Sequence, residues 1–229
     1  MTTYAIATTS ALCVNGPLEP NEFYHAYAAA LGIGDKQGYA AIMRELDELD
    51  DLARNKVFNI GFCVNSCWIN PGLRWTHRWD AGCIDEAKER YGQQIQAIEN
   101  CLPSAIKIIG REHLRFLKNR LECTIIQLEV ARLMKSLSTF CDHTKPDALT
   151  DQEKETVSTV CDQAMTLAHK YVERHAQQIV DRGCEGTLIN YFVTIPYFID
   201  HIRTVFVEGE TECTHILPRF DEPPAPMIV

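Results

Sequence analysis

The chain has 229 residues, a formal net charge of -9, and a composition that is 46% hydrophobic and 23% charged. This negative charge argues against a general nucleic-acid binder, which needs a basic face to displace counterions. No apolar run approaches the roughly 20 residues that a membrane span requires. We therefore expect a soluble globular protein with a sizeable core, and with neither nucleic acid nor membrane among its partners.

The first residues, MTTYAIATTSALCV, have no basic segment ahead of their apolar part, so they do not predict a secretory signal. A cytoplasmic location is therefore the default expectation. The 10 cysteines are spread almost evenly, and only Cys63 and Cys67 lie close together, with His77 as a third candidate ligand. Because a second Cys or His pair is missing, we expect reduced thiols, no metal site and no cofactor.

Helical periodicity divides the chain into three parts. Residues 1–19 contain the turn signal Asn15-Gly16-Pro17 and predict an extended arm. Residues 20–206 predict one helical domain. Residues 207–229 contain 4 prolines, which interrupt regular helix, and predict an extended tail.

Within the helical domain, apolar residues recur at spacings of three and four, which is typical of amphipathic helices. The predicted helices cover residues 20–34, 36–58, 83–101, 111–141, 151–182 and 194–206. Pro103 ends the third helix, and Thr150 caps the fifth. The longest helix carries the apolar stripe Leu114, Leu117, Leu121, Ile125, Leu128 and Leu137. The pattern predicts an all-α fold, an antiparallel bundle of about five or six helices with an irregular Trp-rich insert.

That insert covers residues 59–80, NIGFCVNSCWINPGLRWTHRWD, and holds all 3 tryptophans of the chain. It has no helical period, and two interpretations stay open. The rings could fill a gap between diverging helices as a core plug. They could instead stack on a sugar or another planar ligand, while neighbouring cations bind its carboxylate or hydroxyl groups. The candidate ligand-binding residues are Trp68, Arg74, Trp75, His77, Arg78 and Trp79.

A second candidate site residue is Glu185, which stands between Gly183 and Gly186. Backbone freedom there would let the carboxylate be aimed at a ligand, although a lone carboxylate in a turn is commonly solvated or caps a helix. The chain has no phosphate loop, no dinucleotide fingerprint, no G-x-S-x-G elbow and no HExxH motif. His169 and His175 lack the spacing of a paired metal site, so we expect each to be structural or exposed.

The helix over 36–58 combines an apolar stripe with a cluster of acidic side chains. The stripe contains Ile42, Leu46, Leu49, Ala53 and Val57. The acidic residues are Glu45, Asp47, Glu48, Asp50 and Asp51. Paired carboxylates of this kind bind magnesium diphosphate in helical terpene cyclases, but a second metal-binding motif is missing from the other helices. A solvated face opposite the leucine stripe is therefore the better interpretation.

The order of these segments resembles a known family. FYHAYAAALGI precedes the acidic helix and the Trp-rich insert, and RxxLxxLKNRLECTIIQLEVARLM and RGCEGTLINYF follow them. This order is similar to the helical C-terminal region that follows the barrel in some large bacterial glycoside hydrolases, and the likeness covers most of residues 20–206. It implies an accessory domain of a carbohydrate-active enzyme, whose insert helps to wall a sugar site and whose catalytic residues lie outside this chain.

The residues themselves also support a different class of function. A helical interaction or scaffolding module would dock a partner chain, such as a catalytic domain or another protein, on its exposed helix faces. The Trp-rich insert would then be a core plug. A stand-alone enzyme is a weaker third hypothesis, for which Glu185, His77 and Arg78 are the groups to test. Arg74, His77 and Arg78 are costly to bury without partners, so an insert that is entirely core would need acidic partners for them or a route to solvent, whereas a cleft lined by them would favour ligand binding.

Overall fold

The computed structural model describes residues 19–52, 80–141, 148–177 and 195–209. These residues are helical apart from short turns and one isolated antiparallel bridge between Ile33 and Ala105. The prediction of an all-α fold is confirmed. In chain order the elements are α2 (Pro20–Leu31), α3 (Lys36–Asp51), α5 (Ala81–Cys101), η3 (Leu102–Ser104), α6 (Ile108–Cys141), α7 (Asp151–Ala176) and a helix over 195–203 that continues into the π-helical turn η5 (Thr204–Glu208).

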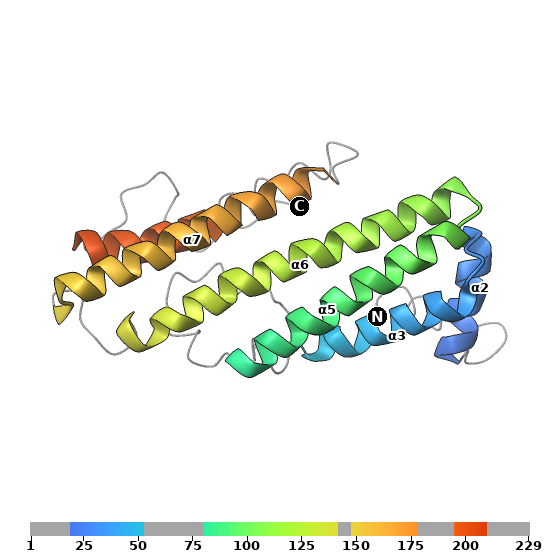
Figure 1. The fold of residues 1–229 in the computed structure, drawn as a ribbon, viewed down its shortest axis with the longest axis horizontal. Helices are drawn as coiled ribbons and strands as arrows, with labels where there is room; N and C mark the ends of the chain where they lie inside the picture. The colour runs from blue at the N-terminus through green and yellow to red at the C-terminus, as the bar shows by residue number, and fades with distance from the viewer. Residues whose placement is uncertain (1–18, 53–79, 142–147, 178–194, 210–229) are drawn as a thin grey trace, which may run out of the picture.

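The long helices lie side by side in an elongated bundle (Figure 1). α6 is the central helix and packs against α5 on one side and α7 on the other. α3 packs against α5, and α2 packs against α3 and the first part of α6 at one end of the bundle. The segment 195–208 runs beside α7. α6 has 34 residues and therefore spans about 51 Å.

Polar side chains fix where three of these helices begin. Asp35 Oδ1 accepts a hydrogen bond from the Gly38 amide at 2.8 Å, and Asp80 Oδ1 accepts one from the Cys83 amide at 3.0 Å. Thr150 and Glu153 form a reciprocal capping box at the start of α7. The predicted Thr150 cap is confirmed. Such a box stabilises the beginning of a helix because it provides hydrogen-bond acceptors for amides that have no partner within the helix.

The ends of the helices are also defined by local chemistry. α2 ends at Gly32, which takes the left-handed conformation with a φ of 73°. α5 ends at Cys101, and Pro103 lies in the following 3-10 turn, as the sequence predicts. The last helical turn extends past the predicted end at residue 206, since η5 continues to Glu208 and Val207 packs against the core. The parts of the predicted helices beyond Leu52 and before Ile195 lie outside the described residues.

The core follows the predicted apolar stripes and extends beyond them on α6. Leu114, Leu121, Leu128 and Leu137 are buried, and Leu117 and Ile125 are partly buried. A further set of α6 side chains is buried as well: Cys123, Ile126, Val130, Ala131 and Met134. α6 needs this wider apolar arc because two neighbouring helices cover it.

Buried thiols contribute to this core as small apolar groups. Cys101, Cys123 and Cys161 are buried. Burial raises the pKa of Cys161 to about 12, so this thiol stays protonated at neutral pH.

None of the described helices, the long α6 and α7 included, combines the length and apolarity needed to cross a bilayer.

Candidate functional site

The site residues predicted from the sequence lie outside the described ranges of the chain, and their predicted roles stay predictions. Of the Trp-rich insert 59–80, only Asp80 is described, and its carboxylate caps α5. The residues concerned are Trp68, Arg74, Trp75, His77, Arg78, Trp79 and Glu185. The candidate sites below are therefore built from the helices themselves.

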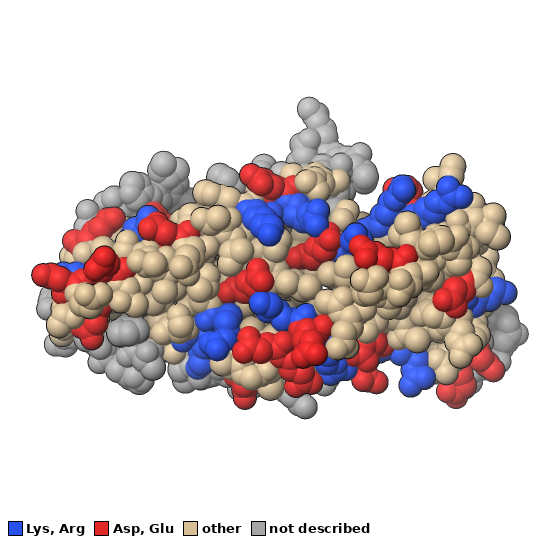
Figure 2. All heavy atoms as spheres, viewed as in Figure 1, with Lys and Arg blue, Asp and Glu red and all other residues tan. Residues whose placement is uncertain are grey.

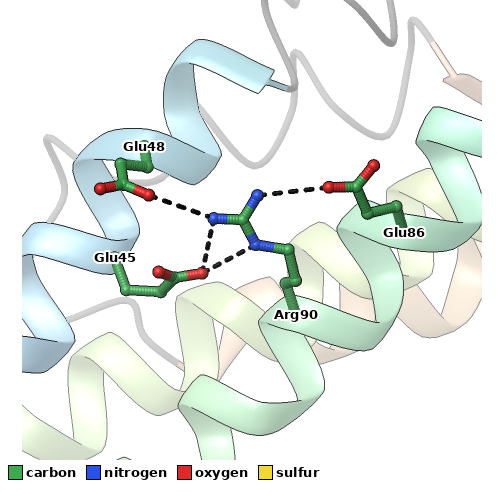
Figure 3. A network of polar contacts seen from close by, with 4 residues as sticks. All are labelled: Glu45, Glu48, Glu86 and Arg90. Atoms are coloured by element: carbon green, nitrogen blue, oxygen red, sulfur yellow. Dashed lines mark hydrogen bonds and ion pairs between the residues drawn. The ribbon is translucent and has the colours of Figure 1, made fainter.

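The acidic residues of α3 are used to hold α3 against α5 (Figure 3). Arg90 of α5 donates from Nε to Glu45 Oε1 at 2.8 Å, and its Nη2 lies 2.7 Å from the same oxygen. The same guanidinium lies 3.4 Å from both Glu48 and Glu86. The hydrogen bond to Glu45 is the main cause that raises the pKa of Arg90, so the cation is fixed at all relevant pH values.

The solvated-face interpretation of α3 is therefore wrong in part. The Glu45 side chain is only 28% exposed, and Asp47 Oδ2 accepts a hydrogen bond from the buried Tyr24 hydroxyl at 2.9 Å. Glu48 and Asp50 are exposed, as predicted. The described ranges contain no group of three or more His, Cys, Asp or Glu side chains placed to hold a metal ion.

A cluster of aromatic rings joins α2, α3 and α6 near one end of the bundle. The Tyr39 hydroxyl and His113 Nε2 are 2.9 Å apart, and Tyr27 meets the His113 ring edge to face at 5.9 Å between ring centroids. Burial lowers the pKa of His113 and raises that of Tyr39, so both groups are neutral at neutral pH. The Tyr39–His113 contact gives the buried Tyr39 hydroxyl a hydrogen-bond partner and links α3 to α6. The Tyr27 ring adds α2 to the same cluster.

Charged groups also connect α6 to its two neighbours. Lys118 lies 2.5 Å from Glu99 of α5, and Glu122 lies 2.5 Å from Arg174 of α7. His175 is buried and stacks on Tyr171, while His169 is exposed.

The first candidate site is a trough of about 510 Å³ along the surface where α5, α6 and α7 meet. It is open to solvent, and most of its surface is apolar although five of its seven lining residues are polar or charged. We call it the α5–α6–α7 trough, and its lining residues are Lys88, Glu129, Arg132, Leu133, Gln163, Thr166 and Leu167.

Each charged residue that lines the trough has an ion-pair partner. Lys88 lies 3.1 Å from Glu129, and Arg132 lies 3.4 Å from Asp85. The rim is therefore close to neutral, and the apolar surface comes from side chains such as Leu133 and Leu167. Such an arrangement suits a ligand with an apolar ridge between polar flanks, rather than a small charged metabolite.

The second candidate site is an exposed apolar patch at the beginning of α6. We call it the isoleucine tip, and it consists of Ile106, Ile108, Ile109 and Phe116, which are 79%, 76%, 61% and 50% exposed. Among the described residues these are the large apolar side chains that are most exposed. Exposed apolar side chains that gather at one end of a protein commonly mark an interaction surface.

The backbone around the tip is held firmly against α2. The Ile106 amide donates to the Gly32 carbonyl at 2.8 Å, and Lys107 Nζ donates to the Ala30 carbonyl at 3.2 Å. Arg111 Nε donates to the Ala105 carbonyl at 2.9 Å. The isoleucines therefore project from a fixed turn, in which the polar atoms face the protein and the apolar side chains face outward.

Sequence reasoning missed both surfaces. The trough depends on residues from three helices and has no local signature. The tip had a signal: three isoleucines within four residues begin at Ile106, three residues after Pro103 and before the start of the predicted helix 111–141. α6 in fact begins at Ile108. Comparison of the chain with family models, with curated proteins and with solved structures found no match.

Proposed function

We propose that the chain is a helical interaction module that binds an amphipathic helix of a partner protein in the α5–α6–α7 trough. This is the second of the two function classes that the sequence predicts. The observation that carries the proposal is the trough itself, an apolar channel between three packed helices with paired charges on its rim. An amphipathic helix in an apolar groove is a recurring mode of protein recognition.

The form of the trough favours a helix over a small molecule. Pockets for small molecules typically bury 70–90% of the ligand, and this trough is too open to enclose one. A helix needs only one face covered and can leave its other face in solvent. Gly92, one turn beyond Lys88 on α5, has no heavy atom within 4 Å of an added Cβ, which supports open space continuing along the same face.

The lining also bears on the carbohydrate hypothesis. Sugar rings are commonly bound by stacking on aromatic side chains, and the trough residues include no aromatic ring. The role as an accessory domain of a glycoside hydrolase depends instead on the Trp-rich insert and Glu185, outside the described residues. It remains a separate prediction, to be tested by quenching of tryptophan fluorescence with a panel of oligosaccharides.

The trough is tested with a fluorescein-labelled synthetic amphipathic helix of about 18 residues, whose leucines are three and four positions apart. We expect the full chain to bind it, measured by fluorescence anisotropy. Leu167→Glu should weaken binding at least about tenfold, because a buried leucine contact typically contributes more than 1.4 kcal/mol. His169→Glu is the matched control, since it places the same charge on an exposed position of the same helix.

Two results would contradict the proposal. One is equal binding by the wild type and Leu167→Glu, with circular dichroism showing that both are folded. The other is the absence of binding to helices with leucine, isoleucine or mixed apolar stripes. If an oligosaccharide quenched the tryptophan fluorescence or protected it from a quencher in the same protein, the accessory-domain prediction would replace the proposal of a helix-binding module.

A further inference from the structure

We infer that the isoleucine tip attaches one end of the bundle to the surface of an anionic lipid bilayer. The inference does not depend on the trough. It departs from the sequence-based expectation that membranes are not partners, because that expectation considered only segments long enough to span a bilayer. A protein can lie on a membrane with a few apolar side chains in the interface and cationic groups beside them.

The exposure of the tip is the first observation. Ile106 and Ile108 are 79% and 76% exposed, which is unusual for two isoleucines that flank a single lysine. Both lie at the turn between α5 and α6, at the end of the long axis of the bundle (Figure 1). A protruding apolar end of this kind matches a bilayer, which can accept it without a complementary pocket.

The charge around the tip is the second observation. Residues 106–116 contain Lys107, Arg111 and Arg115 against a single acid, Glu112, which gives a net charge of +2 in a chain of net charge -9. Figure 2 shows several basic side chains along the first half of α6 with acidic side chains beside them, and a larger group of acidic side chains over α3 and α5. The positive end of the α6 helix dipole adds to this local charge.

Apolarity and charge occur together at one end, and this combination favours anionic lipid over an uncharged partner. Basic groups beside a membrane surface are attracted to phosphatidylserine or phosphoinositide headgroups. Acidic side chains farther along the bundle have little effect on the tip, since salt screens exposed charges beyond about 8–10 Å and α6 alone is about 51 Å long. Nearer the tip, Glu112 is paired with Arg115, and Asp35 is followed by Lys36. The tip would therefore meet the membrane while the trough stays in solution.

Firm attachment of the tip to α2 is a third observation. Gly110 lies so close to α2 that an added Cβ would be 2.6 Å from the Leu31 carbonyl oxygen. Together with the hydrogen bonds of Ile106, Lys107 and Arg111 to backbone carbonyls, this contact holds the isoleucines outward. Little conformational entropy is then lost when they enter an interface.

The test is flotation of the full chain with phosphatidylcholine vesicles that contain either no anionic lipid or about a quarter phosphatidylserine. We expect binding to the anionic vesicles, at least about tenfold weaker binding to phosphatidylcholine alone, and release at about 0.5 M salt. Ile108→Ser with Ile109→Ser keeps the charge and should weaken binding at least about tenfold. Gln152→Ser with His169→Ser, at exposed α7 positions, is the matched control.

A second variant separates charge from apolarity. Arg115→Gln removes one cation at a residue that does not support the turn, and should weaken binding to anionic vesicles about fivefold and leave binding to phosphatidylcholine unchanged. The inference is overturned if the folded wild type fails to float with anionic vesicles, or if the isoleucine variant floats as well as the wild type. It is also overturned if light scattering shows a self-associated chain that the isoleucine variant dissociates, because the tip would then be a protein interface. None of these outcomes concerns the trough.

Discussion

Two glycines in the long helices should respond in opposite ways to the same substitution. In a helix interior, Gly→Ala normally stabilises by about 0.8–1 kcal/mol, because glycine loses more backbone entropy on folding. Gly92 of α5 has no heavy atom within 4 Å of an added Cβ. We therefore expect Gly92→Ala to raise the free energy of unfolding by nearly that amount.

Gly110 of α6 is different because α2 lies against it. An added Cβ would be 2.6 Å from the Leu31 carbonyl oxygen and 3.1 Å from Ile33 Cγ1. The first of these atoms belongs to the backbone and cannot rotate away. Overpacking of this kind costs about 1–3 kcal/mol, which exceeds the gain in helix propensity. We expect Gly110→Ala to lower the free energy of unfolding by about 1–2 kcal/mol.

Thermal unfolding followed by circular dichroism is the assay. For a chain of this size 1 kcal/mol corresponds to about 2–4 °C, so Gly92→Ala should raise Tm by about 2–4 °C and Gly110→Ala should lower it by about 2–8 °C. Urea unfolding gives the same comparison at constant temperature. An unchanged or raised Tm for Gly110→Ala would refute the close packing of α2 on α6, and with it the support that the tip receives.

Three further perturbations test other parts of the bundle. Arg90→Met removes the contacts between α5 and the carboxylates of α3, and should lower the free energy of unfolding in urea by about 1–2 kcal/mol. An equal loss at about 1 M salt would argue against an electrostatic cause. Thr150→Ala removes the capping box of α7 and should cost about 1 kcal/mol by the same assay; no loss would mean that the cap is formed by other groups. Burial lowers the folded-state pKa of His113, His175 and His201 below the ordinary value of 6.5, so the unfolded chain binds more protons in this window. The free energy of unfolding should be highest above pH 6.5 and fall as the pH drops below that value. Its slope against pH should be smaller in His113→Gln. A free energy of unfolding that does not change between pH 5 and 8 would contradict the burial of these histidines.

The sequence was sufficient for the helices because their causes are local. Apolar side chains at spacings of three and four, the Thr150 cap and the stop at Pro103 each act within one or two turns. The predicted beginnings of α5 and α6 were late by two and three residues. The first turn of each of these helices has no regular apolar spacing. The first turn of α5 is held by the Asp80 cap, and the beginning of α6 is held by contacts with the end of α2.

Side-chain partners between helices could not be predicted in this way. The acidic residues of α3 suggested a solvated face, yet Arg90 is about 45 residues away along the chain and lies among them. The wide apolar arc of α6 is explained only by its two neighbours, α5 and α7. The trough has the same origin, since three helices must be placed before it exists.

The sequence by itself determined the helical class, the order and approximate bounds of the described helices, and the apolar stripes of α3, α5, α6 and α7. Tertiary structure alone decided which surfaces stay open. An apolar residue such as Ile108 is exposed because the turn before α6 is fixed against α2 and no described element covers it. Exposure depends on what packs next to a residue rather than on the residue itself, and local periodicity carries no information about that neighbour.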